Sequence, residues 1–155
     1  MLLLLFSTHK ERYAINCEHI TEVIPFLDLQ PIPMTPPYVA GAVNYRGTPL
    51  PIINLSQLLD GSDCRNMLST RIILIDYEID RIRGKMTIGL LAEKVIETIK
   101  TPTDWLPDQK KDAPYFIDSS IVAHEMIQWF EPVKMLSNDV LKDLFMEHAT
   151  SQEHQ

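Results

Sequence analysis

Proline placement restricts the fold of this chain more than any other feature of its sequence. There are 11 prolines against only 5 glycines, and seven of the prolines lie between residues 25 and 51. Because proline lacks a backbone donor and ends helices, regular elements must be short and often interrupted. We therefore expect no long helix before residue 137.

Short β-rich runs lie between these prolines. Their lengths and their β-branched and aromatic residues are typical of strands, and they cover residues 2–6, 13–15, 39–43, 50–55, 71–77, 86–91, 121–122 and 126–130. Residues 78–85 are polar and predict a hairpin loop. One long helix is predicted, at residues 137–149, as a lid on the strands, followed by a disordered tail at 150–155. The fold class is therefore mainly all-β.

An internal repeat indicates how the strands are organised. Residues 14–24 (AINCEHITEVI) align with residues 89–99 (GLLAEKVIETI), and residues 38–59 match residues 115–136 at nearly the same offset. We predict two similar β-modules within one domain at 1–150, covering approximately 14–70 and 71–136 plus the strand at 2–6. Each module is too small to bury a generous core alone, so the two should share an apolar interface.

Composition excludes several classes of protein. The 155 residues are 45% hydrophobic and 23% charged, as in an ordinary globular domain. A net charge of −7 disfavours nucleic acid as a partner. The apolar start, residues 1–6, is far shorter than the roughly 20 residues that cross a bilayer. The sequence shows no secretory signal pattern, and its two cysteines lack metal-site or disulfide spacing. We therefore expect a cytoplasmic location without membrane insertion.

A search for catalytic motifs finds no phosphate loop, zinc motif or nucleophile elbow. The five histidines do not share the spacing of metal ligands, so no metal and no cofactor are expected. Cys17 with His19, at i,i+2 on one strand face, is one enzymatic alternative, and the repeated glutamates are another. A small thiol beside a surface histidine and a shared structural role for the glutamates are the simpler interpretations.

The most distinctive segment is PPYVAGAVNYRGTPLPIINLSQLL, residues 36–59. Gly41 and Gly47 suit positive φ or a close backbone approach, and residues 44–47 (NYRG) predict a turn between two strands. Prolines 49 and 51 alternate with apolar residues after this turn, which predicts an edge strand.

Together with YAIN at 13–16 and GLLAEKV at 89–95, the segment at 41–55 resembles the signature of the CheW family. Members of this family are adaptors that couple bacterial chemoreceptors to their histidine kinase, and they are not enzymes. The resemblance covers roughly residues 2–136. It implies a fold of two SH3-like five-stranded barrels that share a hydrophobic interface. Asn54, Ala92-Glu93 and Asp118 depart from the family pattern.

The resemblance also implies two binding surfaces, one for the regulatory domain of a CheA-type kinase and one for the hairpin tip of a chemoreceptor. Matched by position, the receptor-binding residues are Ile20, Glu22, Val23, Arg46 and Val95, and the turn residues Asn44 and Gly47 contact kinase or receptor. Taken without the resemblance, the apolar members of this set could equally be core residues and Arg46 a solvated charge. A location at membrane-associated receptor arrays is implied. The alternative function is a regulatory domain that binds the kinase without bridging to a receptor.

Overall fold

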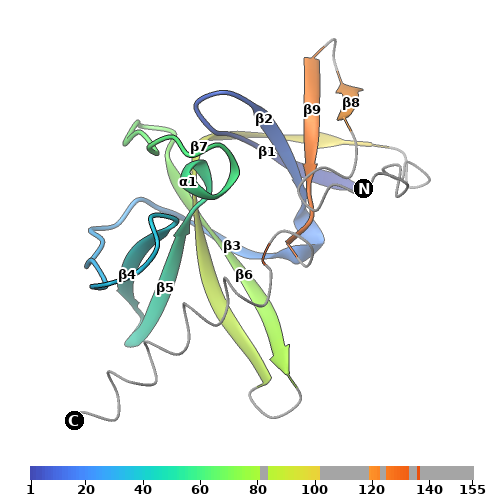
Figure 1. Cartoon of the computed structure of the whole chain (residues 1–155). Coiled ribbons are helices and arrows are strands. Elements are labelled where there is room, and N and C mark those ends of the chain that lie inside the picture. The colour runs from blue at the N-terminus through green and yellow to red at the C-terminus, as the bar shows by residue number, and fades with distance from the viewer. Residues whose placement is uncertain (81–83, 102–118, 123–124, 133–135, 137–155) are drawn as a thin grey trace.

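The computed structural model describes residues 1–80, 84–101, 119–122, 125–132 and 136. Within these residues the chain forms nine strands and two short helices (Figure 1). The elements are β1 (Leu2–Ser7), β2 (Arg12–Asn16), η1 (Cys17–His19), β3 (Ile20–Pro25), β4 (Val39–Tyr45), β5 (Thr48–Asn54), α1 (Leu55–Leu59), β6 (Arg71–Asp80), β7 (Gly84–Lys100), β8 (Ser119–Val122) and β9 (Glu125–Phe130). The mainly β class is confirmed, and every run expected to be a strand contributes to one.

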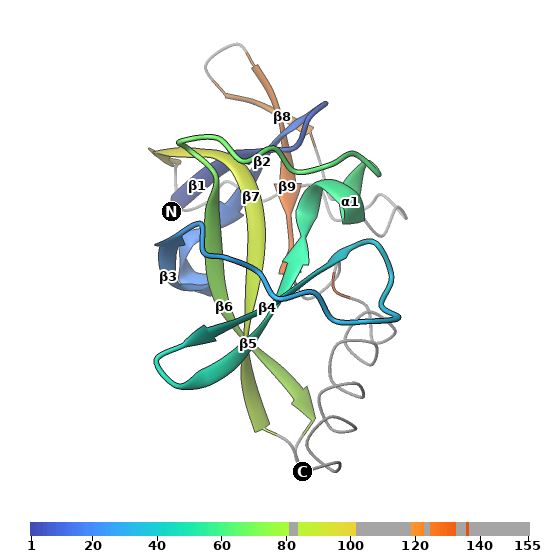
Figure 2. The same ribbon diagram turned by 90° about the vertical axis from the view of Figure 1, so that its left-hand side faces the viewer.

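The strands pair as two sets of five that share β7. The first set contains β3, β4, β5, β6 and the N-terminal part of β7. The second set contains β1, β2, β8, β9 and the C-terminal part of β7. Figure 2 shows β7 running from its hairpin with β6 to the strands of the second set. That each set resembles an SH3 barrel stays a prediction, and the predicted helix and tail after residue 136 lie outside the described residues.

The expected module boundary at residue 70 is wrong. Strand β6 begins at Arg71 but pairs with β3 and β7 of the first set. Strand β2 precedes the first set in sequence but pairs with β1 and β9 of the second. The reason is the length of β7, which continues to Lys100 instead of ending at residue 91, so that one strand passes from the first set into the second. Each set therefore takes strands from both halves of the chain.

The internal repeat is confirmed by the pairing registers. Residues 14 and 89 align in the repeat, and Ala14 pairs with Leu5 while Gly89 pairs with Leu74. The same two positions pair in parallel with Trp129 and Ile52, which also correspond in the repeat. Each strand pair of the first set thus has a counterpart in the second with the same register.

Three clusters of buried apolar residues follow this organisation. One cluster joins the two sets, because Phe6, Tyr13 and Phe130 from the second set pack with Ile73 and Leu90 from the first. The Phe6 ring stacks on Tyr13 at 5.5 Å between centroids and meets Phe130 edge-on at 5.6 Å. The other two clusters lie within one set each. The expected shared apolar interface is confirmed.

Strand β5 is only partly the edge strand that its prolines predict. Pro49 and Pro51 lie in the half that pairs with β4 alone. In the other half, residues 52 and 53 pair with both β4 and β7, and residue 54 pairs with β7. Since proline cannot donate to a ladder, it is confined to the half with one neighbour. The strand ends at Asn54, whose side chain accepts a hydrogen bond from the Gln57 backbone N–H at 3.3 Å and caps α1. Asparagine and aspartate are comparable N-caps, so the departure at residue 54 preserves this role.

Candidate functional groove

The turn between β4 and β5 consists of two residues, Arg46 and Gly47. The last pair of the ladder is Tyr45 with Thr48, and the two turn residues have φ of 51° and 82°. Positive φ at both positions is the geometry of a type I′ hairpin turn, which matches the twist of the strands. The predicted turn at 44–47 is confirmed in its position. The observed turn is shorter than predicted, because Asn44 and Tyr45 are the last residues of β4.

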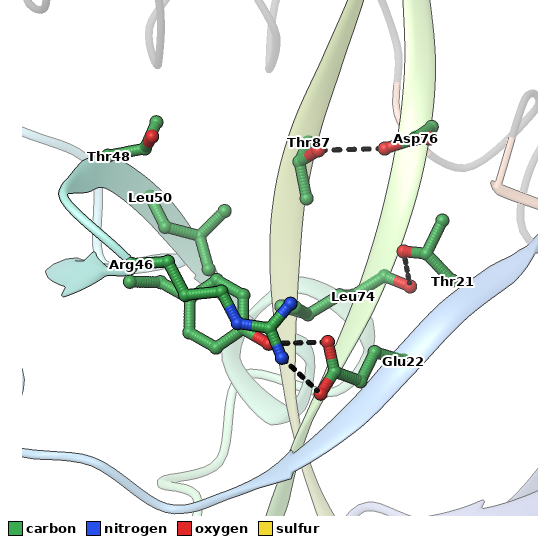
Figure 3. Close-up of a pocket in the computed structure, with 9 residues that line it drawn as sticks. Thr21, Glu22, Arg46, Thr48, Leu50, Leu74, Asp76 and Thr87 are labelled. Atoms are coloured by element: carbon green, nitrogen blue, oxygen red, sulfur yellow. Dashed lines mark hydrogen bonds and ion pairs between the residues drawn. The ribbon is translucent and has the colours of Figure 1, made fainter.

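Arg46 and Tyr45 meet the carboxylate of Glu22, which lies on β3 (Figure 3). The guanidinium carbon of Arg46 lies 4.8 Å from the Tyr45 ring centroid, within the range of a cation–π contact. Its Nη2 is 3.5 Å from Glu22 Oε1, and the Tyr45 hydroxyl donates a short hydrogen bond to Glu22 Oε2. This hydrogen bond to a carboxylate raises the pKa of Tyr45. Residues far apart in sequence thus form one polar contact group.

This contact group borders a groove of about 380 Å³. Leu50 and Leu74, both almost fully buried in the core of the first set, form its apolar floor. At the other end, the Thr87 hydroxyl donates to Asp76 Oδ1 at 2.7 Å, from two residues that pair across β6 and β7. The full lining is Thr21, Glu22, Tyr45, Arg46, Thr48, Leu50, Leu74, Asp76 and Thr87. Apolar surface between charged groups suits a side chain of a binding partner better than it suits bond-making chemistry.

The remaining residues of the predicted binding surface have different positions. Val23 is 40% exposed on β3, and Asn44 and Gly47 are exposed at the end of the β4–β5 hairpin. Ile20 is half-buried and packs against the cluster that joins the two sets. The structure therefore brings Glu22 and Arg46 into contact and leaves Val23 open to solvent.

The expectation that Val95 lines a binding surface is wrong. Val95 is 8% exposed and belongs to the cluster that joins the sets, whereas its neighbour Ile96 is 74% exposed. The pairing of β1 with β7 is irregular here, since Ser7 faces Glu93 but Leu5 faces Glu97. Lys94 has a φ of 50° within this irregularity. A bulge re-aims the side chains that follow it, and the repeat alignment does not reveal it.

The residues considered for catalysis do not form a catalytic group. Cys17 and His19, expected on one face of a strand, lie in the short helix η1, and His19 Nε2 is 3.5 Å from Glu131 Oε1. Burial raises the pKa of the Cys17 thiol and raises that of Cys64 to about 12, where the charge of Glu93 adds to the effect. A protonated thiol is a poor nucleophile.

Three of the four repeated glutamates have separate side-chain partners. Glu22 contacts Tyr45 and Arg46, as described above. Glu97 Oε2 is 3.6 Å from Arg12 Nη2, and the backbone N–H of Glu18 is capped by the Asn16 side chain. Glu93 is fully buried and binds Arg65. They do not form the paired carboxylates of an acid/base site.

Sequence reasoning missed Asp76 and Thr87, which close one end of the groove. Every second residue of a strand shares a face, so Asp76 lies on the face of β6 that carries Ile72 and Leu74 in the core of the first set. That signal was available in the sequence. The pairing of β6 with both β3 and β7 was not, and it alone brings Asp76 to Thr87 and to the groove.

The described residues contain no group of three or more histidine, cysteine, aspartate or glutamate side chains that could hold a metal ion. Among the helices of the same residues, none has the length and apolar character needed to cross a membrane.

The model of the CheW-like domain matches residues 2–140. A CheW chemotaxis protein from Thermotoga maritima is 29% identical over 89 residues, which cover 54% of this chain and 59% of the relative. The protein FrzA from Myxococcus xanthus is 28% identical over 97 residues, covering 62% and 57%. The chain thus matches less than two thirds of the length of these relatives. The structure of the scaffolding protein TtCheW from Thermoanaerobacter tengcongensis superposes with a TM-score of 0.73 at 20% identity, covering 90% of this chain and 89% of that one, and shows the same fold.

Proposed function

Because the chain belongs to the CheW-like domain family, we propose that it is a non-catalytic adaptor that couples chemoreceptors to a CheA-type histidine kinase. The observation that carries the proposal is the match of this family across residues 2–140, in a chain whose described residues present a groove suited to a protein partner. The names of the relatives, chemotaxis proteins and a scaffolding protein among them, support the same role.

The partners that follow are the regulatory domain of the kinase and the cytoplasmic hairpin tip of a receptor. We assign the receptor contact to the exposed part of the surface around β3 and the β4–β5 turn, with Val23, Glu22 and Arg46 as its core. Asn44 and Gly47 extend it along the turn toward either partner. Val95 is buried and Ile20 is half-buried, so their role is to hold β7 and β3 in place. The site of action is the cytoplasmic receptor array.

Binding of the purified chain to each partner tests the proposal. The kinase regulatory domain and a receptor hairpin fragment are immobilised separately and together, and retention of the chain is measured. Retention by each partner, and a ternary complex with both, is the expected result. Retention by the kinase domain alone would replace the adaptor with a regulatory domain that does not bridge to a receptor. Retention by neither would contradict the proposal.

A calorimetric control addresses enzymatic alternatives. We expect neither nucleotide nor divalent metal to bind with micromolar affinity, because both ligands need clustered and oriented donors. Tight binding of either one would instead point to a catalytic or regulatory site.

A further inference from the structure

The residues that line the groove of the first set have equivalent positions in the second set, and the registers identify them residue by residue. In the first set Asp76 pairs with Thr87, and Leu74 pairs with Glu22. In the second set Ser7 pairs with Arg12, and Leu5 pairs with Glu97. Arg12 therefore has the position of Thr87, and Glu97 has the position of Glu22. The two sets differ in the residue that contacts the equivalent glutamate.

In the second set, an arginine reaches that glutamate across a strand. Arg12 lies on β2 and Glu97 on β7, with β1 between them. The Nη2 atom of Arg12 is 3.6 Å from Glu97 Oε2. This part of the fold thus accommodates an arginine side chain that crosses one strand to pair with a carboxylate.

In the first set, the equivalent position holds a side chain too short for that contact. Thr87 donates to Asp76, which stands where the second set has Ser7, so the first set has one carboxylate more at this place. Glu22 is contacted instead from the β4–β5 hairpin, by the Tyr45 hydroxyl and by Arg46 at 3.5 Å, with 75% of the Arg46 side chain exposed. An ion pair this long and this exposed contributes little free energy, so it can rearrange when another cation arrives.

Two carboxylates line the groove from neighbouring strands. Glu22 pairs with Leu74, and Asp76 lies two residues farther along the same face of β6, so the two carboxylates are diagonal neighbours (Figure 3). A guanidinium that enters between them can direct N–H donors to both, while its aliphatic stem lies along the groove. Asp76 uses Oδ1 for Thr87, and its second oxygen adds acceptor capacity. The net charge of −7 also favours a basic partner surface.

We propose that this groove binds an arginine side chain presented by a protein partner, which pairs with Asp76 and Glu22 as Arg12 pairs with Glu97 in the second set. Arginine suits the groove better than lysine, because its planar guanidinium directs several N–H donors to two acceptors at once. The inference rests on the proposed function only in taking the partner to be the receptor, whose contact is assigned above to the surface around Glu22 and Arg46. The groove itself can be tested without the receptor.

The first experiment uses a small probe. Amide resonances of the isotope-labelled chain are followed while N-acetyl-arginine methylamide, or its neutral citrulline analogue, is added to millimolar concentration. We expect the arginine probe to shift the amides of Thr21, Asp76 and Thr87, and the citrulline probe to shift none of them. Asp76→Asn should abolish the shifts, and Asp28→Asn, an exposed aspartate outside the groove, should keep them. Equal shifts from both probes, or none from arginine, would overturn the proposal.

The second experiment uses the partners. Asp76→Asn keeps an acceptor for Thr87, so its melting temperature should match the wild type. We expect it to weaken binding of the receptor hairpin by about tenfold, the loss of one charged hydrogen bond, and to leave binding of the kinase domain unchanged. Wild-type affinity of this variant for the receptor hairpin would overturn the arginine groove and leave the adaptor function intact. If the wild type bound neither partner, the adaptor function would fail, and the probe experiment would still decide the groove.

Discussion

Arg46 combines three features in one turn residue: a positive φ, a face-on contact with Tyr45 and an ion pair with Glu22. Its planar guanidinium can stack on a ring and direct N–H groups to a carboxylate at once, and an ammonium cannot reproduce both. The positive φ belongs to the backbone of the turn and does not depend on the guanidinium group. Contacts made by Arg46 should therefore affect partner binding more than folding.

We expect Arg46→Lys to keep the fold and to lower assembly of the receptor–adaptor–kinase complex, and Arg46→Ala to lower it further. The loss corresponds to about 1–3 kcal/mol if one charged hydrogen bond is removed. Receptor-coupled kinase activity at matched adaptor concentration measures it, with circular dichroism as the control for folding. If the lysine variant activated the kinase as strongly as the wild type, Arg46 would act only as a generic positive charge.

Val23 and Ile24 are adjacent on β3 but differ in exposure, 40% against 4%. Val23→Lys should weaken binding of the receptor hairpin while leaving the melting temperature nearly unchanged, because an exposed position loses little packing. The matched control is Ile24→Ala, which should cost about 2–5 kcal/mol of unfolding free energy. A large fall in melting temperature for Val23→Lys would show that its side chain packs in the core.

The Cys64 thiol should make the fold sensitive to alkaline pH. Its pKa is raised from 9.0 to about 12 in the folded chain, chiefly by burial. Above pH 9 the unfolded chain loses this proton and the folded chain keeps it, so the free energy of unfolding falls as pH rises toward 12. Urea denaturation at pH 9 and pH 10 should show a smaller fall for Cys64→Ser than for the wild type. Parallel falls would show that Cys64 is not the cause.

At the scale of elements, β7 and the segment before β6 depend on one buried carboxylate. Glu93 is fully buried, and Arg65 donates to it from its backbone N–H at 2.7 Å and from Nη2 at 2.9 Å. Val95 N–H further donates to the Ser69 carbonyl at 3.0 Å, so the segment is attached to β7 at two points. Glu93 thus organises the connection between α1 and β6.

Glu93→Gln should lower the free energy of unfolding by about 1.5–3 kcal/mol, since it weakens charge-assisted hydrogen bonds to a buried group. Glu97→Gln is the matched control on the same strand, with a 3.6 Å contact to Arg12 and a side chain 54% exposed. It should cost less than about 1 kcal/mol. Equal costs in urea denaturation would mean that burial of Glu93 does not strengthen its pairing.

Sequence patterns predicted the strands well where alternation and turn residues were local. A turn at residues 44–47 follows from the sequence NYRG, although its type I′ geometry with a positive φ at Arg46 does not, and the buried start of the chain follows from its apolar run. The second half of β7 was missed because charged residues interrupt the apolar run after Leu91, although Glu93 is buried by its pairing with Arg65. Side-chain direction after the bulge at Lys94 was missed because a local φ determines it. The groove depends on strand pairing between distant segments, which one sequence does not reveal.

The two sets should unfold as one unit at the scale of the whole molecule, because they share β7 and the cluster around Phe6 and Ile73. Gly89 in the first set provides the test. A Cβ there would lie 2.3 Å from Ile52 Cδ1 and 2.8 Å from Ile72 Cγ2, whereas its counterpart in the second set is Ala14. An added methyl group at Gly89 should therefore strain the core of the first set.

We expect Gly89→Ala to cost about 1–3 kcal/mol, and Ile52→Val in the same chain to recover part of it by removing the nearest methyl group. In a Trp105→Phe background, fluorescence of Trp129 reports the second set. Its midpoint in urea should shift as far as the circular dichroism midpoint. A shift in circular dichroism without one in fluorescence would show that the two sets unfold independently.

The exchange of strands between the two sets determines whether half of this chain could fold without the other half. Each half of the sequence supplies strands to both sets, so a half-chain alone leaves its own ladder incomplete. Two identical half-chains related by a two-fold axis would complete each other's ladders in the register seen here, since the pairs Leu5–Ala14 and Leu74–Gly89 are equivalent. The architecture is therefore that of a strand-swapped homodimer joined into one polypeptide. Because both copies belong to one polypeptide, they need not be identical, and this chain places an arginine in one copy and a threonine with an added aspartate in the other.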